Sequence, residues 1–77
     1  MGVEAVKNKI IEIVEENLGI TLSENLSLKE NGVDSLSLAH LIVSIEEEFD
    51  ISFSDDDLQP EKLIDLSALL DITIKYL

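Results

Sequence analysis

The sequence predicts an all-α protein: a small four-helix bundle of three main helices, one short helix and a long first loop. Three segments carry apolar residues at steps of three and four, the spacing that gives a helix one apolar face. No segment alternates apolar and polar residues as a half-buried strand does. With 77 residues, the chain is expected to form a single domain over residues 1–77 with a modest core.

The first helix is predicted over residues 3–18, and Gly19 directly after it is a natural C-terminal stop. Most of its charged residues lie off the apolar stripe. That stripe consists of Val3, Val6, Ile10, Ile13, Val14 and Leu18.

Residues 20–34 form a long connection, in which Leu26 and Leu28 are expected to reach the core. Asn31-Gly32 predicts a turn just before the next helix. Loops of this length in a small domain are usually functional or contain a hidden short turn.

The second helix is predicted over residues 35–49, with Asp34 as its N-cap. Its apolar stripe is Leu38, Ile42, Ile45 and Phe49. The acidic run Glu46, Glu47 and Glu48 opposes the helix dipole, which favours cations at this end. Helix stability does not explain the run, so we interpret it as a surface for a partner.

A short helical turn is predicted over residues 60–63, with Pro60 at a tolerated first position. Asp65 is expected to cap a last helix over residues 66–76. Before them, Asp55 to Asp57 are interpreted as capping and solubilising residues.

The charge is strongly acidic, with 17 acids against 5 bases and a net charge of −12. Such a surface repels nucleic acid and anionic lipid and attracts basic patches on proteins, although charge can also serve solubility alone. There is no cysteine, which excludes disulfides and thiolate metal sites. With no secretory signal and no apolar run of about 18 residues, we expect a cytoplasmic monomer without membrane insertion.

Intrinsic catalysis is disfavoured, so we do not expect an enzyme. A serine nucleophile needs a base within hydrogen-bond reach, and the only histidine is His40. On one helix, Ser35 and His40 lie about 140° apart around the axis. Residues 55–57 lack the acid spacing, the glycine and the final glutamate of a calcium loop, so no specific metal site is expected. Weak divalent binding is a minor alternative.

Ser35 is the most informative residue, because it places one hydroxyl at the start of a helix behind the Asn31-Gly32 turn. Taken alone, a serine there most often only caps the helix. A phosphate-bearing group attached to its Oγ would lie at a helix N-terminus, which favours anions. We therefore interpret Ser35 as a candidate attachment point.

The segment Gly32-Val33-Asp34-Ser35-Leu36, followed by Ile45-Glu46-Glu47-Glu48-Phe49-Asp50-Ile51, resembles the acyl carrier proteins. The resemblance extends over nearly the whole chain in length, charge and helix order. It implies that a phosphopantetheinyl transferase moves 4′-phosphopantetheine from coenzyme A to Ser35, and that the terminal thiol carries acyl groups as thioesters.

The resemblance also implies roles for other residues. Asp34 would help to hold the metal and the serine during transfer. Leu36 and the acids Glu46, Glu47 and Glu48 would meet basic patches on partner enzymes, namely the transferase and the ligases or synthases that load acyl or aminoacyl groups. The cargo would lie between the helices, against Ala39, Ile42 and Leu63.

Three positions depart from the family's pattern. Ser37 and His40 stand where fatty-acid carriers usually have acids, and Asn31 stands where a leucine is common. These departures favour a specialised pathway, such as polyketide, lipopeptide, modified-lipid or aminoacyl transfer, over housekeeping fatty-acid synthesis. Two alternatives remain: an aminoacyl carrier (D-alanyl or peptidyl), and an unmodified acidic helical domain that binds a basic partner.

Overall fold

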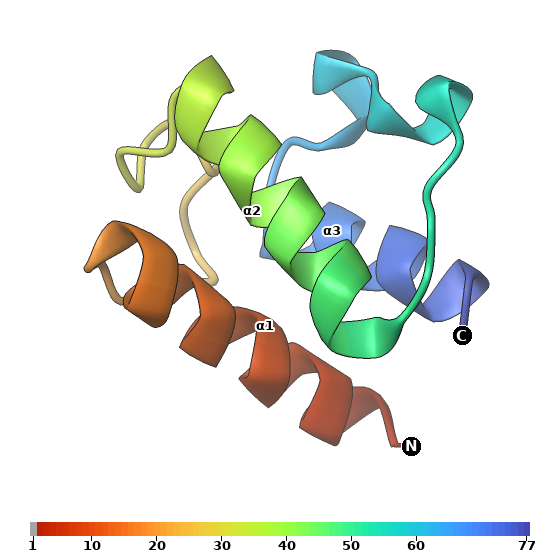
Figure 1. The fold of residues 1–77 in the computed structure, drawn as a ribbon. Coiled ribbons are helices and arrows are strands. Elements are labelled where there is room, and N and C mark those ends of the chain that lie inside the picture. Colours follow the sequence, from red (N-terminus) through yellow and green to blue (C-terminus); the bar gives the residue numbers. More distant parts are fainter. Residues whose placement is uncertain (1) are drawn as a thin grey trace.

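Three helices form the frame of the computed structural model, which describes residues 2–77 (Figure 1). Helix α1 spans Val3–Leu18, α2 spans Ser35–Phe49 and α3 spans Leu66–Lys75. Two short 3₁₀-helices, η1 (Asp55–Leu58) and η2 (Pro60–Lys62), connect α2 to α3. Across the described residues the only strand-like pairing is an isolated bridge. The all-α prediction is confirmed.

The ends of the main helices follow local sequence features. Gly19 adopts a left-handed φ of 70° after α1, and its N–H donates to the Glu15 carbonyl, as a C-terminal glycine cap does. Asp34 caps α2, and Asp65 caps α3 by accepting a 2.9 Å hydrogen bond from the Ala68 N–H. Helix α3 ends at Lys75, one residue before Tyr76, which was the predicted last residue of this helix.

The short-helix prediction over residues 60–63 needs correction. A 3₁₀ turn lies there, over Pro60–Lys62, but a second one precedes it over Asp55–Leu58. The acidic run lies in η1, the earlier of these two turns. Contacts of Asp57 with Lys75 and Tyr76, at the end of α3, hold η1 in place. Because these contacts join residues 18 and 19 positions apart, the local sequence could not reveal them.

The long loop is held by the side chain of Asn31. Its amide group accepts a 2.8 Å hydrogen bond from the Ser23 N–H and donates to the carbonyls of Ser23 and Ser27 at 3.1 and 2.8 Å. Ser27 and Glu30 exchange two further bonds of 3.0 Å, the pattern of a capping box around one hidden turn. Each backbone polar group bonded in this way lowers the cost of ordering the loop.

Leu28 is buried in the core as predicted, whereas the prediction for Leu26 was wrong, because its side chain is 41% exposed. Leu22 is the buried residue in its place. The Leu28 N–H also donates to the Ile64 carbonyl at 2.8 Å. This bond joins the loop to the segment that leads into α3.

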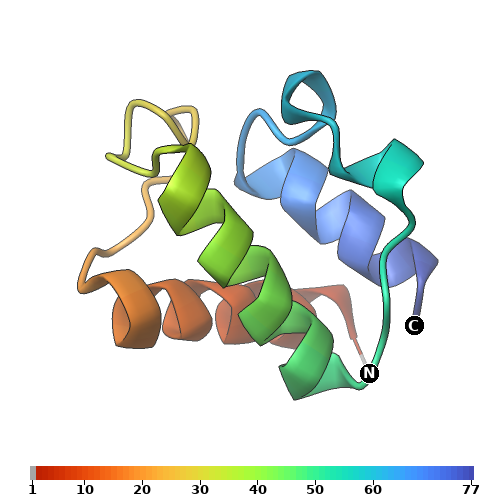
Figure 2. The same ribbon diagram turned by 45° about the horizontal axis from the view of Figure 1, so that its top comes forward.

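Helix α1 packs against both α2 and α3 (Figures 1 and 2). The most deeply buried side chains come from all three helices: Val6, Ile10, Val14, Leu41, Ile45, Leu69 and Thr73. Thr73 is the buried polar member, and its hydroxyl donates to the Leu69 carbonyl at 2.8 Å. Among the described residues, no helix is both long and apolar enough to cross a membrane.

The two ends of the described chain lie near each other, on the side of the molecule away from the start of α2 (Figures 1 and 2).

Candidate functional site

Ser35 is the first residue of α2 and is exposed. Gly32 has a φ of 94°, a backbone conformation that favours glycine, and Val33 after it is buried. The turn is therefore anchored on one side and brings the next two residues to the surface. Among the described residues, the Ser35 hydroxyl makes no hydrogen bond, which leaves its oxygen available for chemistry.

Asp34 holds the N-terminus of α2. Its carboxylate accepts a 2.8 Å hydrogen bond from the Ser37 N–H. Hydrogen bonding from Ser37, chiefly through its N–H, holds the pKa of Asp34 below its ordinary value. The carboxylate is therefore ionised at neutral pH and caps the first turn of α2 through the Ser37 N–H.

Two grooves meet at Ser35. The first, which we call the apolar groove, has a volume of about 360 Å³ and runs along α2. Its lining residues are Ser35, Leu38, Ala39, Ile42, Val43, Glu46, Leu58 and Leu63. The second, which we call the loop groove, has a volume of about 500 Å³ and lies between the long loop and the segment before α3. Its lining residues are Ser27, Leu28, Lys29, Val33, Asp34, Ser35, Leu38, Leu63 and Ile64.

The apolar groove contains all three residues predicted for the cargo pocket: Ala39, Ile42 and Leu63. On α2, Ser35, Ala39 and Ile42 follow one another at steps of four and three, so they lie on one stripe of the helix. Leu58 of η1 completes the wall, and the sequence reasoning missed it. The only feature of the sequence that could have indicated Leu58 is its position as an apolar residue directly after three aspartates.

The three glutamates near the end of α2 have different surroundings. The Glu46 carboxylate accepts a 2.8 Å hydrogen bond from the Phe53 N–H and lines the apolar groove. Glu48 lies 3.6 Å from the Lys9 ammonium of α1. Glu47 is exposed and has no ion-pair partner in the part of the chain that the structure describes. Of the three, Glu47 is exposed and without an ion-pair partner among the described residues, while Glu48 is exposed beside Lys9.

Leu36 is 71% exposed, as a residue that contacts partners would be. Val43 lies seven residues further along α2, on the same face, and is 51% exposed. His40 is also exposed and lies between them on that face. The first half of the exposed face of α2 therefore carries no acid and is partly apolar.

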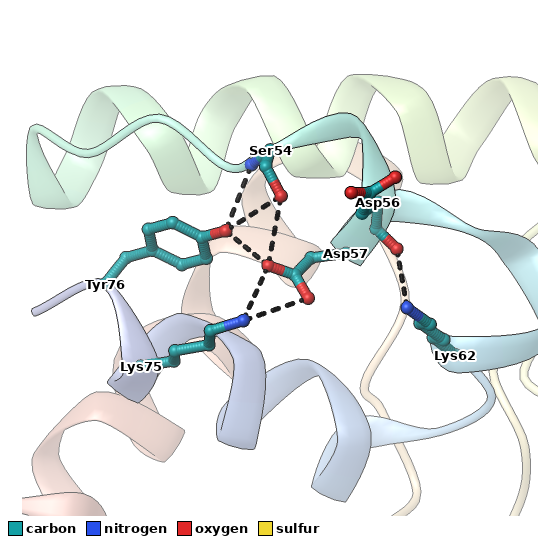
Figure 3. Close-up of polar contacts among 6 residues, drawn as sticks. All are labelled: Ser54, Asp56, Asp57, Lys62, Lys75 and Tyr76. Carbon is teal, nitrogen blue, oxygen red and sulfur yellow. Dashed lines mark hydrogen bonds and ion pairs between the residues drawn. The ribbon is translucent and has the colours of Figure 1, made fainter.

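Asp57 joins η1 to the end of α3 (Figure 3). Its carboxylate accepts a hydrogen bond from the Tyr76 hydroxyl and lies 3.0 Å from the Lys75 ammonium. The Tyr76 hydroxyl is also bonded to Ser54, at 3.2 Å from its N–H and 3.1 Å from its hydroxyl. We call this set, Ser54, Asp57, Lys75 and Tyr76, the latch. It fixes the turn that presents Leu58 to the apolar groove.

The latch also affects titration. The hydrogen bond from Tyr76 and, after it, the one from Lys75 hold the pKa of Asp57 below its ordinary value. The Phe53 ring meets the Tyr76 ring edge-on, with centroids 5.3 Å apart. Asp57 thus bridges η1 and the end of α3 through Tyr76 and Lys75. The interpretation of residues 55–57 as capping and solubilising residues missed this role.

Within the described residues, no three His, Asp or Glu side chains are grouped so as to hold a metal ion.

Comparisons with known proteins point to one family. The family model described as "Phosphopantetheine attachment site" matches residues 8–70 of the chain. An acyl carrier protein of Buchnera aphidicola subsp. Baizongia pistaciae is 32% identical over 75 residues, which is 92% of this chain and 94% of that protein. One from Nitratidesulfovibrio vulgaris, strain Miyazaki F, is 42% identical over 59 residues, 71% of this chain and 78% of that protein.

Solved structures give the same result for the fold. The crystal structure of an acyl carrier protein from Thermotoga maritima has a TM-score of 0.81 and 30% identity, covering 96% of this chain and 88% of that one. A second match comes from a crystal structure of an engineered Bradyrhizobium japonicum glycine:[carrier protein] ligase complexed with carrier protein from Agrobacterium tumefaciens and AMP. Its TM-score is 0.78 at 26% identity, over 88% of this chain and 97% of the matched one.

Proposed function

The chain belongs to the acyl carrier protein family, and from that premise we propose that it carries acyl groups as thioesters on an arm attached to Ser35. Members of this family are carrier proteins and not enzymes, and the cofactor of this chain is a covalently attached 4′-phosphopantetheine. When bound, that cofactor supplies the thiol that the cysteine-free chain lacks.

The exposure of Ser35 at the meeting point of two grooves is the observation that carries this proposal. A group linked to its hydroxyl has open space on either side, and no bond among the described residues has to be broken to reach the oxygen. The neighbouring Asp34 is ionised and holds the helix start in place. The residues present therefore fit a phosphodiester-linked arm.

The attachment step uses coenzyme A as the co-reactant. The Ser35 oxygen forms a new bond to the phosphorus next to the pantetheine. The pyrophosphate bond of coenzyme A breaks, adenosine 3′,5′-bisphosphate leaves, and the hydroxyl proton is released. A separate transferase catalyses this exchange, and we assign to Asp34 the task of orienting the serine and the metal that the transferase uses.

For the cargo, we favour acyl chains over aminoacyl groups. The apolar groove is lined mainly by aliphatic side chains from α2 and the segment around Leu63, and an acyl chain buried there gains about 0.8 kcal/mol per methylene group. The aminoacyl alternative rests on the match to the structure of a glycine ligase with a carrier protein. These two cargoes can be distinguished by loading the holo protein with a fatty-acyl or a glycyl group and comparing the rates of thioester hydrolysis. A fatty-acyl group bound in the apolar groove should be hydrolysed more slowly than a glycyl group, which is too small to fill the groove.

We infer partners with a basic patch that meets the end of α2. Glu47 supplies an unpaired charge there, and Leu36 and Val43 supply apolar contact closer to Ser35. Such electrostatics gives fast encounter and modest affinity, which suits a carrier that must move between enzymes. Because α2 has no acid from Ser35 to Ile45, we place the chain in a specialised pathway.

Intact mass spectrometry tests the attachment. The chain is incubated with coenzyme A, magnesium and a broad-specificity phosphopantetheinyl transferase, beside the variants Ser35→Ala and Ser37→Ala. We expect one phosphopantetheine on the wild type and on Ser37→Ala, and none on Ser35→Ala. Ser37 is a matched control because it lies two residues along the same helix.

Addition to Ser35→Ala would place the arm elsewhere. If the folded wild type gains no mass, the assay is repeated with the host's own transferase. A second failure would reject the attachment and favour an unmodified acidic interaction domain.

A further inference from the structure

Lys29 differs from the other basic residues of this acidic chain. The chain has five bases, and four of the ammonium groups have partners: those of Lys7, Lys9, Lys62 and Lys75. The Lys29 ammonium has none within residues 2–77, and its side chain is exposed. Lys29 also lines the loop groove together with Ser35. An unpaired cation thus lies in the groove that begins at the candidate attachment point.

The backbone around Lys29 is well anchored. Leu28 before it is buried and bonded to Ile64, and the Lys29 carbonyl accepts a 3.0 Å bond from the Gly32 N–H. The capping box of Ser27 and Glu30 spans the same turn. The position of Lys29 beside the groove is therefore fixed, while its four-carbon side chain can still move.

A phosphodiester at Ser35 would be an additional anion on a surface of net charge −12. The free amides at the start of α2 are one source of compensation, but the Asp34 carboxylate already accepts a hydrogen bond from one of them, the Ser37 N–H. Asp34 also brings a negative charge to the same groove. Among the groove's lining residues, Lys29 is the one cation, and its single positive charge would offset part of this negative charge.

We propose that the loop groove is the resting site of the first part of the phosphopantetheine arm, and that the Lys29 ammonium pairs with its phosphodiester. This inference rests on attachment at Ser35. The aliphatic side chains of Val33, Leu63 and Ile64 would contact the two methyl groups that follow the phosphate in the arm. Lys29 is a positioning residue: it holds the arm at the edge shared with the apolar groove, where Leu38 and Leu63 line both.

The test compares apo and holo forms of four proteins: the wild type, Lys29→Met, Lys29→Arg and Lys9→Met. Lys9→Met is the matched control, because it makes the same charge change beside Glu48, at the far end of α2. Mass spectrometry first establishes that each protein carries one arm. This step tests attachment separately, so a failure of loading counts against Ser35 and not against Lys29.

Two readouts follow on the loaded proteins. The first is the difference in melting temperature between holo and apo at low and high salt. We expect Lys29→Met to lower this difference by a few degrees at low salt, with the effect reduced at high salt, because exposed ion pairs are weak and screened. Lys29→Arg should restore the wild-type difference, and Lys9→Met should match the wild type.

The second readout is nuclear magnetic resonance. In the wild type, the phosphorus resonance of the arm should shift with salt, and the methyl protons of the arm should show contacts with those of Ile64. Lys29→Met should abolish the salt-dependent shift and weaken these contacts, whereas Lys9→Met should change neither. Identical melting differences and identical spectra for the wild type and Lys29→Met would overturn the proposal and leave the arm in solvent.

Discussion

Adjacent residues of α2 have distinct roles although they share a charge. Glu46 holds the backbone of Phe53 and lines the apolar groove, whereas Glu47 projects its charge into solvent. A sequence reader sees one acidic run, because nothing in the three letters separates a carboxylate bonded to a distant amide from a free one. Glu46 and Glu47 therefore differ because the segment after residue 50 brings the Phe53 N–H to the Glu46 carboxylate and not to that of Glu47.

Asp34 combines a cap with a charge next to the reacting hydroxyl, and two substitutions separate these roles. Asparagine caps a helix about as well as aspartate, whereas alanine does not. We expect Asp34→Asn to keep the wild-type melting temperature but to accept the arm more slowly. Asp34→Ala should show both a lower melting temperature and slower loading.

Thermal unfolding by circular dichroism and a mass-based time course of loading measure the two effects. Wild-type loading by Asp34→Asn would show that the carboxylate serves only as a cap.

At the scale of elements, the latch connects η1 to α3 through one carboxylate. The pKa of Asp57 is lowered in the folded chain, so its contacts stabilise the fold at pH values above about 4 and are lost as the pH falls through the folded-state pKa. We expect Asp57→Asn to melt at a lower temperature than the wild type at pH 7. The gap should shrink as the pH falls below about 4.

Asp56→Asn is the matched control, because Lys62 is bonded to the backbone carbonyl of Asp56 and not to its carboxylate (Figure 3). Melting curves of the three proteins from neutral to acid pH measure the gap. If it persists unchanged into acid, the Asp57 charge does not hold the latch.

The main helices could be predicted from the sequence because their determinants are local. The apolar stripes, Gly19 and the caps Asp34 and Asp65 all act within a few residues of the helices that they define, and the predicted bounds of α1 and α2 agree with the structure. The η1 turn could not be predicted, because it depends on Tyr76 and Lys75. The loop was only partly predictable, since Asn31 holds it through side-chain bonds to residues up to eight positions away.

The candidate site was predictable to a similar extent. The residues chosen for the cargo pocket do line one groove, because helical spacing places Ala39 and Ile42 on the stripe that begins at Ser35. Leu58 and Lys29 were missed, because both reach the grooves from segments whose path is set by long-range packing. Ser35 as the attachment point stays a prediction until the loaded chain is analysed.

At the scale of the whole molecule, repulsion among acids opposes folding. Seventeen acids face five bases, and the ion pairs of Lys7 and Lys9 lie at the surface, where each contributes little. We expect the melting temperature of the apo chain to rise by several degrees between low ionic strength and roughly 0.5 M sodium chloride, because salt screens the repulsion. Calorimetry at several salt concentrations measures this.

Sucrose at equal osmolality is the control for effects on water, since it screens no charge. A melting temperature that does not respond to salt would mean that the folded chain compensates its acids better than their number indicates.

The position of the chain ends has a practical consequence. Because both ends lie away from the start of α2, a resin, a fluorescent label or a surface linked to either end would leave Ser35, the first residue of that helix, on the opposite side of the molecule (Figure 1). The immobilised protein could then be presented to candidate enzymes one after another and recovered after each. The same geometry that separates the ends from the serine thus makes the chain suitable as bait for identifying the enzymes that load and unload it.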